Sequence, residues 1–237
     1  MKARTIIALT AYQGSGKDTA ANYLCNCFNF SRIAFADQLR TLVKEKYKFT
    51  DQQLDHPLKD TYLHPTLKIT PREAMIKTAS FFRKFDDDYF VHHVEFSMEG
   101  KENIVITDLR FSNEEKFLRK LNTESKVIVI RIDRKSTKTE KSVDEIKYDY
   151  KINNDNSIFE LYSELNKILQ SEDILKNTNP FPALLDLALS NKFDILAKNL
   201  EKIADVLNKE ERTILSNAIF EKCITTKSNV DFTSELH

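Results

Sequence analysis

The chain has 237 residues, and its 36 lysines and arginines balance 36 aspartates and glutamates, so its formal net charge is zero. A hydrophobic fraction of 41% with a charged fraction of 30% is typical of a globular protein of one or two domains and excludes a disordered chain. The zero net charge gives no global electrostatic reason to bind nucleic acid or an anionic membrane, and no apolar run reaches the roughly 18 residues that span a bilayer.

The N-terminal stretch has the pattern of a strand, a turn and a helix, followed by a second strand and helix. Residues 4–10 are a short run rich in β-branched side chains, which predicts a buried strand. Residues 17–28 place apolar side chains on one helical face. A second strand is predicted at 31–36, and Asp37 suits the N-cap of a helix over 38–47.

The next segment begins without a regular pattern and becomes helical. Residues 48–70 contain Pro57 and Pro65 and predict no regular element. Thr70 followed by Pro71 is typical of an N-cap with proline at the first helical position, so we expect a helix to about residue 84. Three aspartates at 86–88 precede a further helix to about residue 96. Such a triplet more often complements a helix N-terminus than binds a metal.

Strand and helix patterns continue to residue 170. Apolar runs predict strands at 103–107, 126–132 and 148–153. The spacing of Ser112 and Glu115 predicts a capping box for a helix to about residue 121, and 157–169 has a helical pattern. Residues 133–147 are almost wholly polar and charged, so we expect an exposed, mobile loop.

Alternating strands and helices predict an α/β fold with a mostly parallel sheet flanked by helices. A polar stretch at 171–179 precedes Pro180 and Pro182, so we expect one domain over 1–170 and an all-helical C-terminal extension over 171–237. In the extension an apolar stripe at helical spacing runs over 193–207, and a second helix is expected over 210–223. The stripe either packs on the protein itself or forms a dimer or partner surface.

A phosphate-binding pattern lies between the first predicted strand and helix. It resembles the P-loop G-x-x-x-x-G-K-[ST], whose backbone N–H groups surround phosphates while its lysine contacts the β- and γ-phosphates. Ala11 stands in place of the first glycine, and Asp18 in place of the residue that binds Mg²⁺. A carboxylate is a good Mg²⁺ ligand, so Asp18 is a candidate, with Thr19 as the alternative. The residues expected to bind ATP are Gly14, Ser15, Gly16, Lys17, Asp18 and Thr19.

Asp108 directly follows the apolar strand at 103–107. In a parallel sheet it emerges at the carboxyl edge beside the phosphate loop, where a Walker B carboxylate holds Mg²⁺ or its waters. The alternative is an ordinary aspartate at a strand end.

Several arginines stand near predicted strand and helix ends, and their planar guanidinium groups suit phosphoryl oxygens. For each of them a surface salt bridge is the alternative. Arg72 and Arg110 are the strongest functional candidates. Arg131 and Arg134, with the charged loop 133–147, are expected to close over a nucleotide and exclude water.

Five short segments occur in a fixed order along the chain. They are Gly-Ser-Gly-Lys-Asp-Thr at 14–19, Ala-Phe-Ala-Asp-Gln-Leu at 34–39, Thr-Pro-Arg-Glu at 70–73, Thr-Asp-Leu-Arg-Phe-Ser-Asn-Glu at 107–114 and Ile-Asn-Asn-Asp at 152–155. Together they resemble the deoxynucleoside monophosphate kinases of tailed phages and large DNA viruses. The resemblance covers about residues 3–170, and its most specific parts are the Lys-Asp form of the P-loop and the Asp-x-Arg-Phe segment.

The resemblance implies a P-loop kinase that uses ATP and Mg²⁺ and transfers the γ-phosphate to a deoxynucleoside 5′-monophosphate, in the cytoplasm or, for a virus, the host cytoplasm. It assigns the monophosphate to Asp37, Arg72 and Arg110. Phe82-Arg83 stands where a Gly-Arg pair is usual, and Arg83 is a further candidate. The catalytic set is Lys17, Arg72, Arg110 and Arg134; the substrate-binding set is Asp37, Arg72, Arg83, Asp108 and Arg110; and the metal-binding set is Asp18, Thr19 and Asp108.

Two other functions remain open at this point. One is another small-molecule P-loop kinase, for example of the phosphomevalonate type. The other is a nucleotide-gated binding or assembly protein that uses the helical extension as its effector surface. A homodimer is compatible with each of them, and neither nucleic acid nor a membrane is expected as a partner.

Overall fold

The computed structural model describes residues 4–135, 137, 139–174, 186, 211–215, 217 and 219. The chain forms two compact units, one of Met1–Ala21 with Phe30–Lys151 and one of Asn22–Asn29 with Ile152–His237. The chain passes from one unit to the other between residues 21 and 22, 29 and 30, and 151 and 152. The domain boundary expected near residue 171 stays a prediction.

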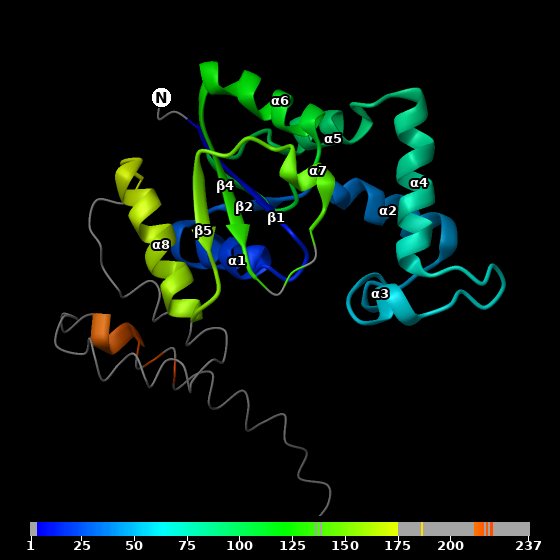
Figure 1. The fold of residues 1–237 in the computed structure, drawn as a ribbon, viewed down its shortest axis with the longest axis horizontal. Coiled ribbons are helices and arrows are strands. Elements are labelled where there is room, and N and C mark those ends of the chain that lie inside the picture. The colour runs from blue at the N-terminus through cyan, green and yellow to red at the C-terminus, as the bar shows by residue number, and fades with distance from the viewer. Residues whose placement is uncertain are drawn as a thin grey trace, which may run out of the picture. The chain divides into compact units, whose positions relative to one another are not determined.

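A five-stranded sheet confirms the predicted α/β fold class (Figure 1). Its strand order is β2-β3-β1-β4-β5, and β1 pairs in parallel with both β3 and β4, as β2 does with β3. The strands are β1 (Arg4–Ala11), β2 (Ser31–Ile33), β3 (Asn103–Ile106), β4 (Ser125–Asp133) and β5 (Tyr150–Asn153). The segments that follow β1, β3 and β4 therefore leave the sheet at one edge.

Helices form close to the positions that the sequence predicts. They are α1 (Lys17–Phe28), α2 (Ala36–Tyr47), α3 (Leu58–Thr61), α4 (Pro71–Phe85), α5 (Tyr89–Ser97), α6 (Ser112–Lys120), α7 (Lys141–Asp144) and α8 (Ile158–Ser171). Short 3₁₀ turns lie at Gln52–Leu54 and Leu121–Thr123. The region 48–70, expected to be irregular, thus contains α3 and a 3₁₀ turn.

The central strand β1 is buried along almost its whole length, because sheet neighbours flank it and side chains cover both its faces. Ile6 and Ala8 of β1 belong to a core cluster that also takes side chains from α5, such as Val94. This packing fixes the end of β1, and therefore the start of the phosphate loop, relative to the rest of the sheet.

Helices α2 and α4 pack side by side through a second apolar cluster (Figure 1). Leu39 and Val43 of α2 face Ala74 and Met75 of α4 in this cluster. Helix α4 begins at Pro71 with Thr70 as its N-cap, as predicted. The Thr70 side chain accepts from Glu73 N at 3.2 Å, and Glu73 accepts from Thr70 N at 2.9 Å.

Two predicted caps are wrong. Helix α2 has Phe35 as its N-cap, and the Asp37 carboxylate instead accepts from Ala34 N at 2.8 Å within the turn before the helix. At α6 the carboxylate of Glu114, one residue before the predicted Glu115, accepts from the backbone of the helix start. In both cases the helix begins one or two residues before the position that the spacing indicates. Asp37 therefore lies in the first turn of α2, and Glu114 in the first turn of α6.

The charged stretch 133–147 contains structure that its polarity does not predict. It forms the short helix α7, in which Val143 is fully buried, and Ile146 just after α7 joins the core cluster beneath β4. The predicted wholly exposed loop is therefore wrong for its second half, because these two apolar side chains anchor it.

The second unit joins the end of α1 to α8. Tyr23 and Tyr162 stack with their ring centroids 4.0 Å apart, and Tyr23 OH donates to Asn166 Oδ1 at 2.8 Å. The Asp186 carboxylate accepts from Asn26 Nδ2 at 2.8 Å and from Tyr162 OH. The predicted helices over 193–207 and 210–223 lie outside the described residues, apart from 211–215, 217 and 219. Within the described parts no helix has the length and apolarity to cross a bilayer.

Candidate active site

The turn between β1 and α1 has the backbone geometry that a phosphate-binding loop requires. Gly14 and Gly16 have backbone φ angles of +82° and +99°, which residues other than glycine rarely adopt. Ser15 N donates to Tyr12 O at 3.2 Å, and α1 begins directly afterwards at Lys17. The loop therefore presents its amides next to a helix N-terminus, where an anion is stabilised.

Lys17 and Asp18 pair with each other at the start of α1. Lys17 Nζ lies 2.9 Å from Asp18 Oδ1 and 3.0 Å from Asp18 Oδ2, and the Asp18 side chain is 77% exposed. Both charged groups lie where the phosphate loop ends and α1 begins. A nucleotide bound to the loop would therefore lie close to a cation and to an exposed carboxylate.

Asp108 is at the predicted sheet edge, but its carboxylate serves the start of α2. Its two oxygens accept from Phe35 N at 2.8 Å and from Ala36 N at 2.9 Å. Burial raises the pKa of Asp108, and the two amide hydrogen bonds oppose that rise. The structure therefore uses Asp108 to join β3 to α2, and Lys17 does not pair with it.

Glu114 and Arg83 form a largely buried pair behind Asp108. Glu114 is 2% exposed, accepts from Arg110 N at 3.0 Å and Phe111 N at 3.1 Å, and lies 3.5 Å from Arg83 Nη2. Burial, followed by the negative charge of Asp108, raises the pKa of Glu114 to about 8. The Arg83 guanidinium also lies 4.0 Å from the ring centroid of Phe111. The substrate role assigned to Arg83 stays a prediction.

Arg72 reaches the phosphate loop through a ring of polar contacts. It pairs with Asp60 of α3 and donates through Nη2 to Gln13 Oε1 at 3.4 Å. The Gln13 amide lies 2.5 Å from His56 Nε2, and His56 Nδ1 lies 3.0 Å from Asp60 Oδ2. The start of α4 and the α3 segment are thereby attached to the loop, which brings the predicted Arg72 to the phosphate site.

Lys59, beside this ring on α3, is a candidate that sequence reasoning missed. Two carboxylates close to Lys59 in the chain each pair with an arginine: Asp60 pairs with Arg72, and Asp55 lies 3.0 Å from Arg40 Nη2. The Lys59 backbone N–H donates to Asp55 O at 2.7 Å, whereas its ammonium makes no hydrogen bond or ion pair within the described residues. Its pKa is lowered by burial and then by the charges of Arg72, Arg40 and Arg110.

This arrangement brings four cations together, Lys59, Arg40, Arg72 and Arg110, and such a cluster suits an anionic group. The members come from α2, α3, α4 and the segment after β3. No sequence motif links them, and only Arg72 and Arg110 were predicted.

The loop after β4 lies against the phosphate loop. Arg134 Nη1 donates to Gly14 O at 3.4 Å, and a Cβ placed on Gly14 would lie 3.9 Å from Thr137 Cγ2. Further along the same loop, Glu140 Oε2 accepts from Arg110 Nη1 at 2.7 Å. The charged stretch therefore contacts the site at two places, and its closure over a nucleotide stays a prediction.

Arg131 has a different role from the one expected. It is 7% exposed and donates through Nη2 to Tyr12 OH at 2.6 Å and to Asp144 at 2.9 Å, and Tyr12 OH also donates to Asp144. Its Nε donates to Asp133 at 2.8 Å. Arg131 thus connects Tyr12, before the phosphate loop, to Asp144 of α7. Its guanidinium group hydrogen-bonds to protein side chains.

The residues fit a magnesium ion that is carried by nucleotide phosphates. Among the described residues, no three acidic, histidine or cysteine side chains converge as a preformed metal centre. Mg²⁺ at nucleotide sites typically takes one or two protein oxygens and completes its shell with phosphates and water. The exposed Asp18 and its neighbour Thr19 can supply such an oxygen. The metal-binding role of Asp108 stays a prediction, since both its oxygens accept from amides.

Comparison with known proteins finds a relative by sequence. The chain is 30% identical over 184 residues to a protein of Acanthamoeba polyphaga mimivirus that carries the name deoxynucleotide monophosphate kinase, and the match covers 68% of this chain and 93% of that protein. No family model matches the chain.

Solved structures of small-molecule kinases are less similar to the chain in sequence than the mimivirus protein is. A variant of the Mycobacterium tuberculosis APS kinase is 14% identical with a TM-score of 0.38, and the match covers 71% of this chain and 98% of that one. Shikimate kinase from Aquifex aeolicus is also 14% identical with a TM-score of 0.38, covering 72% and 99%.

Proposed function

The chain belongs to the deoxynucleotide monophosphate kinase family, and from that membership we propose that it transfers the γ-phosphate of ATP to a deoxynucleoside 5′-monophosphate, giving ADP and a deoxynucleoside diphosphate. The observation that carries this proposal is the phosphate loop with two arginines on it. Arg72 contacts Gln13 and Arg134 contacts Gly14, so cations from two distant segments converge on the turn that ends in Lys17.

ATP binds with its phosphates on the amides of residues 14–19. Lys17 places its charge on the β- and γ-phosphates, and Arg134 approaches from the loop after β4. Magnesium, when bound with ATP, neutralises phosphate charge, and Asp18 or Thr19 is the protein group placed to hold it. The contacts of residues 133–147 with the loop exclude water, which otherwise competes as the phosphoryl acceptor.

The acceptor phosphate binds between α2, α3 and α4. Arg72 and Arg110 provide forked donors there, and both are already held at the site by Asp60 and Glu140. Lys59 adds a charge that forms no ion pair within the described residues. A phosphate monoester is largely dianionic near neutral pH, so its oxygen attacks without a dedicated base, and catalysis consists of alignment and charge neutralisation.

A screen of acceptors tests the proposal. Purified full-length protein is incubated with ATP, Mg²⁺ and each deoxy- or ribonucleoside monophosphate, and ADP is quantified. We expect ADP only when a deoxynucleoside monophosphate is present. ADP formed with phosphomevalonate instead would identify another P-loop kinase, and tight ATP binding without transfer to any acceptor would favour the nucleotide-gated binding protein.

The matched control for the screen is Lys17→Ala. We expect this substitution to abolish ADP formation, since it removes the charge that contacts the β- and γ-phosphates. The circular dichroism spectrum and the unfolding midpoint are expected to stay nearly unchanged, because the Lys17 ammonium pairs only with the exposed Asp18 within the described residues. Unchanged turnover in this variant would end the P-loop assignment.

A further inference from the structure

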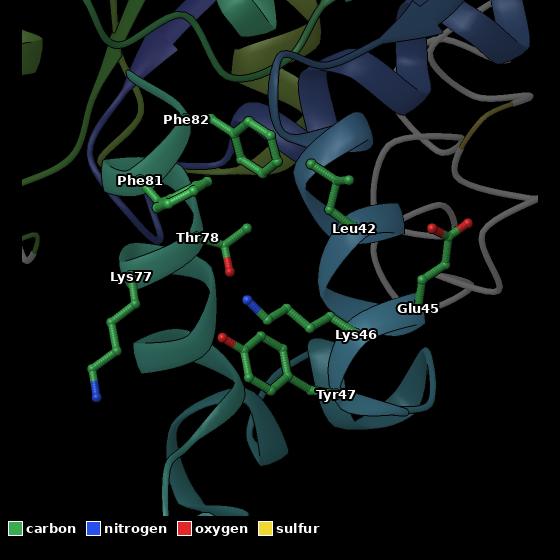
Figure 2. A pocket seen from close by; sticks show the side chains of 8 residues that line it. All are labelled: Leu42, Glu45, Lys46, Tyr47, Lys77, Thr78, Phe81 and Phe82. Carbon is green, nitrogen blue, oxygen red and sulfur yellow. The ribbon is translucent and has the colours of Figure 1, made fainter. Parts of the chain in front are cut away.

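A groove of about 520 Å³ lies between α2 and α4, and no step of the proposed reaction uses it (Figure 2). We call it the α2–α4 groove; it is bounded by Leu42 and Tyr47 on α2 and by Thr78 and Phe82 on α4. Its volume falls within the roughly 300–1,000 Å³ range of small-ligand sites.

The α2–α4 groove lies apart from the four cations around Lys59. A helix rises about 1.5 Å per residue, so Tyr47 lies roughly 10 Å along α2 from Arg40 and Phe81 roughly 13 Å along α4 from Arg72. Leu42 also stands about 200° around α2 from Arg40, and Phe81 about 180° around α4 from Arg72. Arg40 and Arg72 belong to the cationic cluster around Lys59, whereas Leu42 and Phe81 line the groove. A ligand in the groove is therefore separate from the acceptor phosphate.

The groove combines aromatic surface with a buried hydroxyl that lacks a partner. Phe81 is 57% exposed, and its ring meets that of Phe82 edge-on at 5.5 Å between centroids. Thr78 is 6% exposed, and its Oγ1 has no hydrogen-bond partner. Figure 2 shows this hydroxyl directed into the groove, toward Tyr47. A buried polar group without a partner in a cavity is an observation that a ligand group explains.

The Lys46 ammonium gives the groove its charge preference. Lys46 extends from α2 across the groove toward Thr78, whereas Lys77 extends from α4 on the side away from α2 (Figure 2). Neither lysine has an ion pair within the described residues, and Lys46 contacts only the Tyr47 ring, at 5.6 Å from its centroid. Glu45 is the single acidic side chain in the lining.

We propose that the α2–α4 groove is a second nucleotide site, in which a free nucleoside phosphate places its base against Phe81, Phe82 and Tyr47 and its phosphates on Lys46. Aromatic side chains stack on any base, ammonium groups suit phosphate, and the Thr78 hydroxyl gains a polar partner on the base or sugar. The proposal goes beyond the kinase reaction and does not depend on which acceptor is phosphorylated.

Photolabelling with 8-azido-ATP tests this site in the full-length protein. After irradiation and proteolysis, we expect labelled peptides from α2 near Tyr47 and from α4 near Phe81, in addition to label at the phosphate loop. Lys17→Ala is expected to reduce the phosphate-loop label and to leave the groove label intact. Absence of label on the α2 and α4 peptides overturns the proposal.

Paired variants separate the groove from a general charge effect. Lys46→Ala is expected to lower the groove label at least tenfold, and Thr78→Val, which keeps the shape, several-fold. Lys48→Ala removes an exposed lysine at the end of the same helix and is expected to change neither label. Equal label in the two lysine variants overturns the proposal.

Two further readouts keep the result independent of the kinase assignment. Unlabelled dATP is expected to compete for the groove, whereas competition by a single-stranded oligonucleotide but not by dATP would overturn the assignment to a free nucleotide. ADP formation in the acceptor screen is measured on the same variants. Labelling of the groove is measured independently of ADP formation. Failure of the kinase proposal and failure of the groove proposal are therefore distinguishable.

Discussion

At the scale of single residues, Lys59 has the clearest link between structure and proposed chemistry. Burial lowers the pKa of its ammonium, the charges of Arg72, Arg40 and Arg110 lower it further, and the charge of Asp60 opposes them only in part. A bound phosphate would reverse that repulsion. The folded protein therefore keeps Lys59 at a cost to stability, as is common for groups at functional sites.

We predict that Lys59→Met separates stability from activity. The unfolding midpoint is expected to rise, since one of several repelling cations is removed, while KM for the deoxynucleoside monophosphate rises about tenfold or more, equivalent to roughly 1.4 kcal/mol of binding free energy. KM for ATP is expected to stay within about twofold. Steady-state kinetics with each substrate varied in turn, and thermal unfolding, provide the measurements.

The control for Lys59 is Lys84→Met on α4, which removes an exposed lysine outside both the acceptor cluster and the phosphate loop. We expect its kinetics to match wild type. If Lys59→Met raised both KM values alike, or lowered the unfolding midpoint, Lys59 would be structural rather than a contact of the acceptor phosphate.

Glu114 makes a pH-dependent contribution whose sign follows from its burial. Its pKa rises from an ordinary value of 4.5 to about 8, so between these pH values the folded protein holds a proton that the unfolded chain has released. Stability from this group is therefore fully present below about pH 4.5 and falls as pH rises toward 8.

Glu114→Gln is predicted to remove this dependence. The variant cannot ionise, so its free energy of unfolding relative to wild type is expected to increase from pH 5 to pH 8, by a few kcal/mol in order of magnitude. Urea unfolding of both proteins at pH 5, 6, 7 and 8, followed by circular dichroism, measures the difference. A difference that stays constant across this range contradicts the assignment.

At the scale of elements, local patterns predicted most of the fold, and tertiary contacts explain what they missed. The β-branched run at 4–10 and the proline after Thr70 carry their own signals, so β1 and the start of α4 lie where expected. Helix α7 was missed because only Val143 and Ile146 interrupt the charged stretch around it.

The candidate site divides in the same way. The phosphate loop is continuous in sequence, and its glycine spacing identifies it. The cation cluster is assembled from four separate segments, so Lys59 and Arg40 carry no sequence signal. Asp108 has the position expected of it, but sequence cannot show that the amides of Phe35 and Ala36 take up its oxygens.

The join between the phosphate loop and α7 yields a prediction about elements. Tyr12 OH contacts both Arg131 and Asp144, and Tyr12→Phe removes the hydroxyl while leaving the ring in place. We expect a loss of about 1–3 kcal/mol in the free energy of unfolding, because a buried guanidinium loses an acceptor, and a several-fold rise in KM for ATP with KM for the acceptor little changed.

Tyr148→Phe is the matched control, since the Tyr148 ring lies farther from the same guanidinium, at 5.9 Å, and is half-exposed. We expect wild-type kinetics from it. Equal KM values for ATP in Tyr12→Phe and wild type would show that the join stabilises the fold without shaping the nucleotide site.

At the scale of the whole molecule, the second unit shows that residues beyond the predicted kinase domain contribute to its packing. Asp186, which is 1% exposed, accepts from Asn26 of α1 and from Tyr162 of α8. Burial, followed by the hydrogen bond to Asp186, raises the pKa of Tyr162, so this hydroxyl stays protonated and continues to donate. Residue 186 therefore satisfies two polar side chains that lie before residue 171.

This packing predicts that Asp186→Ala destabilises the protein without removing its chemistry. The substitution leaves the buried Tyr162 OH without its acceptor, which is expected to cost about 1–3 kcal/mol, whereas the exposed Asn26 amide can bind water instead. Asp186→Asn, which keeps an acceptor oxygen, is expected to lose less. Urea unfolding measures the loss, and ADP formation per folded molecule is expected to match wild type, since none of these residues belongs to the phosphate loop or the acceptor cluster.

A chain ended at residue 170 provides the decisive comparison, because it lacks Asp186 together with the rest of the C-terminal extension. If the extension completes the packing of α1 and α8, the shortened chain loses at least as much stability as Asp186→Ala and keeps its turnover at temperatures where it stays folded. If the extension is instead an effector surface, the shortened chain unfolds like wild type and only a partner interaction is lost.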